Sequence, residues 1–170
     1  MPTLHACSLA RLPETVAATG ASHLVTLFTA GTAVRRPPAI EAERHLVLGV
    51  SDISAPQADH ILPAEAHVRA LLDFVRGWDR ARPLVIHCYA GISRSTAALY
   101  VAACALQPEQ DEGAIASELR RASPSATPNR LLVEIADGLL ERDGRMVVAI
   151  AGIGRGAEAY EGTPFHLALA

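Results

Sequence analysis

The segment LVIHCYAGISRST, residues 84–96, contains a cysteine and an arginine at a spacing suited to the handling of an oxyanion. Cys88 follows a short apolar run, five residues separate it from Arg94, and Ser95 comes directly afterwards. A thiolate is a strong nucleophile, and a guanidinium is a planar fork that binds two oxygens of a tetrahedral dianion. The segment therefore predicts attack of sulfur on phosphorus, with a covalent phosphocysteine as the intermediate.

The residues between the cysteine and the arginine are predicted to form a tight loop around the anion. Gly91 supplies the conformational freedom for a sharp curl, so that successive N–H groups point inward at the start of a helix that begins near Ser93. The helix dipole, these amides and Arg94 all favour the thiolate form of Cys88. The predicted phosphate-binding residues are Tyr89, Ala90, Gly91, Ile92, Ser93 and Arg94.

Two neighbouring side chains have supporting roles in this interpretation. Ser95 is predicted to donate a hydrogen bond to the departing thiolate when water releases the phosphate. His87 is predicted to order the loop from behind through its ring nitrogens. A buried cysteine beside a histidine is usually structural, and it is the addition of Gly91, Arg94 and Ser95 in this register that favours a functional site.

The elements around this segment predict an α/β fold. Apolar and β-branched runs predict strands at 4–8, 23–28, 45–50 and 84–86, and helical spacing predicts helices at 9–18, 63–80, 95–106, 108–122 and 127–142. Strands that alternate with helices indicate a central, mostly parallel sheet of about four to five strands with helices on both faces. Such sheets bind ligands beyond the carboxyl ends of their strands, which is where the cysteine loop falls.

The end of the chain is less regular. Thr127 is the expected cap of the helix that follows it, with Pro128 in its first turn. Residues 144–154 are expected to be helical and residues 164–169 extended, with the glycines at 152, 154 and 156 forming a turn. A chain of 170 residues, half of them apolar, predicts a single domain, 1–170, with a core at 4–142 and a C-terminal extension at 143–170.

Composition limits the classes of partner and compartment. The formal charge of −3 and the absence of basic runs longer than pairs such as Arg35-Arg36 give no reason to expect a nucleic-acid partner. There is no signal-peptide pattern and no apolar run long enough to span a bilayer, so a cytoplasmic location without membrane contact is expected. Three cysteines are too few for a disulfide framework, and Cys7 and Cys104 are expected to be core residues.

The cysteine loop resembles the signature of the cysteine-dependent protein tyrosine phosphatases, which reads His-Cys, five residues, Arg and then Ser or Thr. His87, Cys88, Gly91, Arg94 and Ser95 match it, and the form AGISRS resembles the dual-specificity branch. GASHLVTL resembles an early strand of that family, and LRRASPSATPN the segment before its last helix, so the resemblance covers residues 4–142. It implies hydrolysis of phosphate monoesters without a metal or other cofactor.

The resemblance also implies a general acid on a loop some thirty or more residues before the cysteine. Asp52, in the segment DISAP, precedes Cys88 by 36 positions (88 − 52), and Asp59 precedes it by 29 (88 − 59). Asp52 is favoured because it directly follows the predicted strand at 45–50, and Asp59 stays as the alternative.

Several substrates and functions stay open. A phosphorylated protein or a small phosphomonoester is expected, and a loop without lysine weighs against the strongly basic pocket of a phosphoinositide phosphatase. The alternatives are a phosphate-binding module without turnover, and the same chemistry on an inositol phosphate, a nucleotide or an RNA 5′ end. A sulfur-transfer enzyme of the rhodanese type is disfavoured because such loops usually lack this Gly-x-x-Arg-Ser arrangement.

Other motifs carry less weight. GIGRGA at 152–157 satisfies a dinucleotide-binding pattern, but the chain ends before the acidic residue and second strand that such a unit needs. No Gly-x-Ser-x-Gly elbow is present, which disfavours a serine hydrolase. The histidines are scattered without the spacing of a zinc site.

Overall fold

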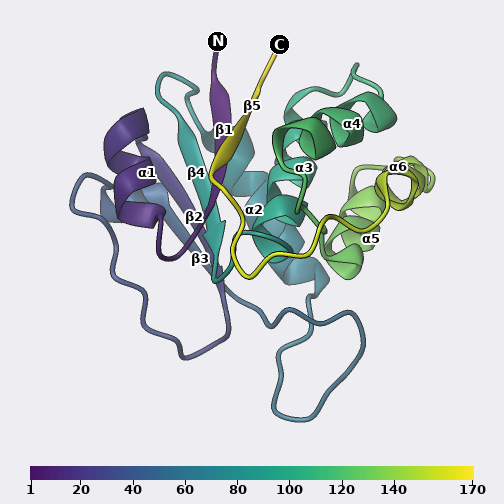
Figure 1. Cartoon of the computed structure of the whole chain (residues 1–170), viewed down its shortest axis with the longest axis horizontal. Helices are drawn as coiled ribbons and strands as arrows, with labels where there is room; N and C mark the ends of the chain where they lie inside the picture. The colour runs from purple at the N-terminus through teal and green to yellow at the C-terminus, as the bar shows by residue number, and fades with distance from the viewer.

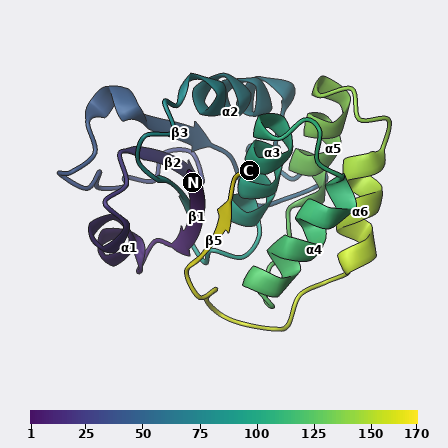
Figure 2. The same ribbon diagram turned by 90° about the horizontal axis from the view of Figure 1, so that it is seen from above.

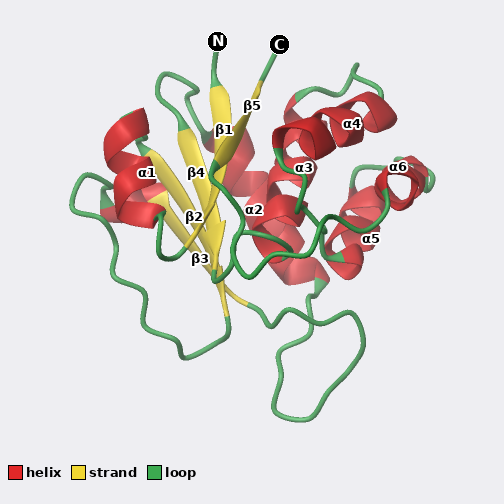
Figure 3. Ribbon diagram, in the orientation of Figure 1, coloured by secondary structure: helices red, strands yellow, loops and turns green.

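Five strands form one sheet in the computed structural model, which describes residues 1–170 (Figure 1). The strands are β1 (Thr3–Ser8), β2 (His23–Phe28), β3 (His45–Gly49), β4 (Leu84–Cys88) and β5 (Phe165–Ala168). Their order across the sheet is β3-β2-β4-β1-β5. The first four strands pair in parallel, and β5 pairs antiparallel with β1 at the edge. The predicted α/β fold with a mostly parallel sheet is confirmed (Figure 3).

Helices cover both faces of this sheet. They are α1 (Leu12–Thr19), α2 (Glu65–Gly77), α3 (Arg94–Leu106), α4 (Glu112–Ala122), α5 (Arg130–Leu139) and α6 (Arg145–Ile153), with a short 3₁₀ turn at Ala42–Arg44. Figure 2 shows α1 on one side of the strands and the other five helices on the opposite side. None of the helices is both long and apolar enough to cross a lipid bilayer.

Helix α3 is the element that brings the cysteine loop to the centre of the molecule. Almost every side chain of α3 is buried, and small residues such as Ala97, Ala98 and Ala102 let it lie close against the sheet. Strand β4 is buried along its whole length between β1 and β2. The turn between β4 and α3 is therefore held between two buried elements.

The last part of the chain differs in detail from the sequence prediction. The cap of α5 is Asn129 and not Thr127, because the Asn129 side chain accepts a hydrogen bond from the Leu132 amide at 3.1 Å. Gly152 lies inside α6, and the turn starts at Gly154, whose φ of +64° ends the helix. The expected helix at 144–154 and extended segment at 164–169 are present as α6 and β5.

Residues 143–170 share the core of the preceding residues. Met146, Leu167 and Leu169 are buried in the same apolar cluster as α3 and β4. β5 completes the sheet by pairing with the first strand of the chain, in the register Thr3 with Ala168 and Ala6 with Phe165. The two ends of the chain consequently leave the sheet side by side (Figure 1).

Candidate active site

Cys88 is the last residue of β4 and lies at the bottom of the loop, with 3% of its surface exposed. Its sulfur accepts a hydrogen bond from the Gly91 amide at 3.3 Å and lies 3.1 Å from the Ser95 hydroxyl. Both neighbours can donate to a negative charge on the sulfur. No metal-binding cluster of histidine, cysteine or carboxylate side chains accompanies them.

The carbonyl groups of the loop are held from outside. The Tyr89 carbonyl accepts from the Leu9 amide at 3.0 Å, and the Ile92 carbonyl accepts from the Thr127 amide at 2.9 Å. Every peptide bond is trans, so the N–H that follows each carbonyl points in the opposite direction. The amides next to these two carbonyls are thereby turned toward the centre of the loop, where an anion can accept from them.

Gly91 is the residue that lets the loop pack against the end of β1. Its φ is +71°, and a Cβ built on it would lie 2.7 Å from the Ser8 amide nitrogen and 2.8 Å from the Cys7 carbonyl carbon. Both atoms belong to the backbone and cannot move aside cheaply. Only glycine fits at this position of the loop.

His87 lies behind the loop in a chain of hydrogen bonds. Its Nδ1 is 3.3 Å from the Cys88 carbonyl, which can only accept, so Nδ1 carries the proton. Its Nε2 then accepts from the Thr26 hydroxyl at 2.8 Å, and that hydroxyl accepts in turn from His45 Nε2 at 2.8 Å. Burial lowers the pKa of His87 to about 4, and the ring is neutral at pH 7.

Arg94 is buried with 8% of its surface exposed and is fixed on one side of its guanidinium. One Nη1 proton is donated to the Val50 carbonyl at 3.0 Å, and the guanidinium carbon lies 5.8 Å from the centre of the Phe28 ring. The Nε–H is buried without a partner. A buried donor that lacks an acceptor costs about 1–3 kcal/mol, and a bound oxyanion within reach of Nε would relieve that cost.

Asp52 lies beside the loop, just past the end of β3. Its Oδ1 accepts from the Ser93 hydroxyl at 2.7 Å and from the Asn129 side-chain amide at 2.9 Å. Two donors on one oxygen leave Oδ2 as the atom that can carry a proton. Asp59, the alternative acid, is exposed, has a φ of +59°, and makes no hydrogen bond to the loop.

The side chains of Asn129 and Ser93 that hold Asp52 were not predicted from the sequence. The sequence points to Ser93 only for its backbone amide, and to Asn129 only as the end of the segment 119–129 that resembles the family. Asn129 comes from α5, and it also donates to the Ile53 carbonyl at 3.2 Å, so it ties the acid loop to the far end of the site. Its position 77 residues from Asp52 gives no local signal in the sequence.

The side chains of three other candidate residues, Cys7, Cys104 and Arg36, make no hydrogen bond to the cysteine loop. Cys7 pairs with His87 in register and so faces the side of the sheet opposite to Cys88. Burial raises the pKa of Cys7 to about 11 and that of Cys104 to about 12, so both are protonated at pH 7. Arg36 donates to the Ile40 carbonyl within its own loop.

A cleft of about 590 Å³ opens beside the loop. Its walls come from Asp52 in the loop after β3, the end of the cysteine loop, the start of α5 with the residues just before it, and the end of α6 with the residues that follow it. The lining includes Asp52, Ile92, Ser93, Pro128, Arg130 and Arg155. The cleft borders the cysteine loop at Ile92 and Ser93 and the candidate acid at Asp52.

No protein-family model and no curated protein matches the sequence. Solved structures do match the fold. The PTP-2 phosphatase of Cydia pomonella is 17% identical over 79% of this chain and 84% of its own, with a TM-score of 0.62. Human DUSP28 is 19% identical over 82% and 88%, and DUSP15 is 15% identical over 94% and 96%, each with a TM-score of 0.62. The chain therefore has the fold of the cysteine-dependent dual-specificity and protein tyrosine phosphatases.

Proposed function

We propose that the protein, acting as one domain over residues 1–170, is a cytoplasmic phosphatase that hydrolyses phosphate monoesters of proteins through a phosphocysteine. The observation that carries the proposal is the sulfur of Cys88 beside two donors, at one end of a loop whose other end holds a buried guanidinium with no acceptor for its Nε. A phosphoryl group above the sulfur would satisfy that donor and the inward amides together.

In the first step the Cys88 sulfur attacks phosphorus while the bond to the leaving oxygen breaks. Arg94 and the loop amides bind the three non-bridging oxygens, where negative charge is spread in the transition state. Asp52 donates the proton on Oδ2 to the leaving oxygen, so that an alcohol departs. The products of this step are the dephosphorylated hydroxyl and a phosphocysteine.

In the second step water attacks the phosphocysteine and the bond between sulfur and phosphorus breaks. The Asp52 carboxylate takes a proton from the water, and the Ser95 hydroxyl, 3.1 Å from the sulfur, donates to the thiolate that leaves. Inorganic phosphate is released. His87, neutral and bonded to Thr26, takes no proton in either step.

An aryl phosphate assay with purified protein tests this proposal. Wild-type protein should release phosphate with a bell-shaped pH profile in the presence of a chelator, and Cys88→Ser should abolish turnover and still bind tungstate. Tungstate binding without turnover in the wild type would instead make the protein a phosphate-binding module. Phosphopeptides, inositol phosphates, nucleotides and RNA 5′ ends, compared by kcat/KM, would then assign the substrate class.

A further inference from the structure

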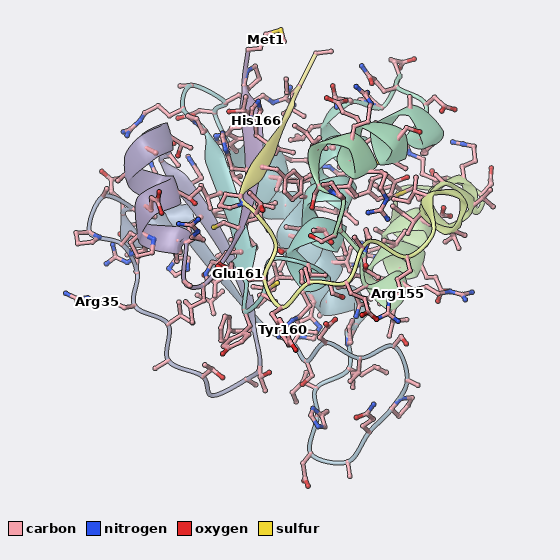
Figure 4. All side chains as sticks on the ribbon, in the orientation of Figure 1. Met1, Arg35, Arg155, Tyr160, Glu161 and His166 are labelled. Atoms are coloured by element: carbon pink, nitrogen blue, oxygen red, sulfur yellow. The ribbon has the colours of Figure 1, made fainter.

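Residues 154–163, called here the C-terminal strap, join α6 to β5 and pass along the outside of the cysteine loop (Figure 4). The figure labels Arg155, Tyr160 and Glu161 along this segment. Two hydrogen bonds attach the strap beside the loop. The Gly162 amide donates to the Ala90 carbonyl at 2.8 Å, and the Ser8 hydroxyl donates to Glu161 Oε1 at 2.5 Å.

The peptide unit that joins Ala90 to Gly91 links the strap to the nucleophile. Its carbonyl accepts from Gly162 outside the loop, and its N–H donates to the Cys88 sulfur at 3.3 Å inside the loop. The two groups of a trans peptide point in opposite directions, so a donor that fixes the carbonyl also fixes the direction of the amide. The amide that contacts the sulfur is therefore oriented from the C-terminal strap.

The C-terminal strap packs so closely against the cysteine loop that position 162 has no room for a side chain. Gly162 is buried, and a Cβ built on it would lie 2.6 Å from the Gly91 carbonyl oxygen. The hydrogen bond between Ser8 and Glu161 also lies next to the nucleophile, because Ser8 pairs with Cys88 in the register of β1 and β4. Ser8 itself is buried. Ser8 also accepts from the Arg11 amide at 3.2 Å, which fixes its hydroxyl.

We propose that the C-terminal strap is a positioning element for the nucleophile: Gly162 holds the Ala90 carbonyl outward and so keeps the Gly91 amide on the sulfur of Cys88, where it stabilises the thiolate. Glu161 secures the strap through Ser8. The catalytic importance of this arrangement rests on the proposed function, whereas the effect on the thiolate does not.

Alkylation of Cys88 by iodoacetamide, followed by mass spectrometry of the peptide that contains it, measures the thiolate directly. Gly162→Ala should push the strap away from the loop. We expect alkylation at pH 6 to slow about tenfold, the order expected when a charged group loses one hydrogen bond. At pH 9.5, where base supplies the thiolate, the rate should stay within about twofold of the wild type.

Gly152→Ala is the matched control, because this glycine lies in α6 with open space around its Cα. It should alkylate like the wild type at both pH values. Unchanged alkylation of folded Gly162→Ala at pH 6 would overturn the proposal, and so would an equal change at both pH values, since that would report access to the sulfur and not its charge.

If Gly162→Ala does not fold, a second pair of variants tests whether the C-terminal strap stabilises the thiolate of Cys88. Glu161→Ala removes the anchor and should slow alkylation at pH 6 about threefold, whereas Glu161→Gln keeps an acceptor for Ser8 and should restore the wild-type rate. Equal rates for Glu161→Ala and wild type would contradict the proposal. Because alkylation needs no turnover, a protein that shows these differences and yet hydrolyses no phosphate ester contradicts only the proposed function.

Discussion

At the scale of single residues, the sulfur of Cys88 lies beside two neutral hydrogen-bond donors. The donors are the Gly91 amide and the Ser95 hydroxyl, and His87 is not available as a base for the sulfur because both of its ring nitrogens are already bonded, one to Thr26 and one to the Cys88 carbonyl. In the proposed reaction, oriented dipoles would stabilise negative charge on the sulfur.

The acid is tested by comparing two aspartates of the same loop. Asp52→Asn removes the proton carried on Oδ2 and should lower kcat for an aryl phosphate about 100-fold or more, with a small change in KM. The alkaline limb of the pH profile should disappear with it. Asp59→Asn is the control and should keep wild-type kcat; a larger loss in that variant would mean that the acid is misassigned.

The guanidinium is tested by Arg94→Lys, which keeps the positive charge but loses the planar fork. We expect kcat/KM to fall about 100-fold or more, because one preorganised donor to the transition state is usually worth that much. Tungstate should raise the Tm of the wild type and have a much smaller effect on the variant. Equal stabilisation of both proteins would show that Arg94 does not bind the anion.

At the scale of elements, the cysteine loop was predictable because its chemistry lies in consecutive residues. The order strand, tight loop and helix follows from an apolar run, a glycine and a helical apolar pattern between residues 84 and 106. The groups that orient the loop were not predictable. Leu9, Thr127 and Gly162 donate through their backbone amides, which residues of almost any type possess, and they meet the loop only through tertiary packing.

Asn129 connects α5 to the loop after β3, and its role in capping the helix can be separated from its role in holding Asp52. Its Oδ1 caps α5, and its amide group donates to Asp52. Asn129→Asp keeps the cap but places a second carboxylate beside Asp52, so kcat should fall at least tenfold with little change in urea unfolding. Asn129→Ala should lose both, with a lower kcat and about 1 kcal/mol less stability. Unchanged kcat in both variants would exclude a role in positioning the acid.

At the scale of the whole molecule, buried imidazoles make stability depend on pH. Burial, reinforced by the charges of His45 and Arg94, lowers the pKa of His87 to about 4, and burial also lowers the pKa values of His23 and His45. The unfolded chain binds protons at these rings near pH 6.5, so it binds more protons than the folded chain between about pH 6.5 and 4.

Stability should therefore fall as the pH drops through that window and level off for His87 below it. From His87 alone we expect a loss of about 2–3 kcal/mol between pH 7 and pH 4.5, measured by urea unfolding. His87→Gln should show a correspondingly smaller difference between the two pH values, although it starts from a lower stability. The same difference in both proteins would mean that other groups cause the acid sensitivity.

The antiparallel pairing of β5 with β1 has a practical consequence for handling the protein. β1 runs toward the cysteine loop and β5 runs back from it, and the Leu169 amide donates to the Pro2 carbonyl at 2.9 Å. Both ends therefore emerge at the end of the sheet opposite to Cys88. An affinity tag or a surface tether fused at either end would therefore lie away from the cysteine loop. A short peptide that joins the two ends would give a circular permutant, whose new ends can be placed in another loop.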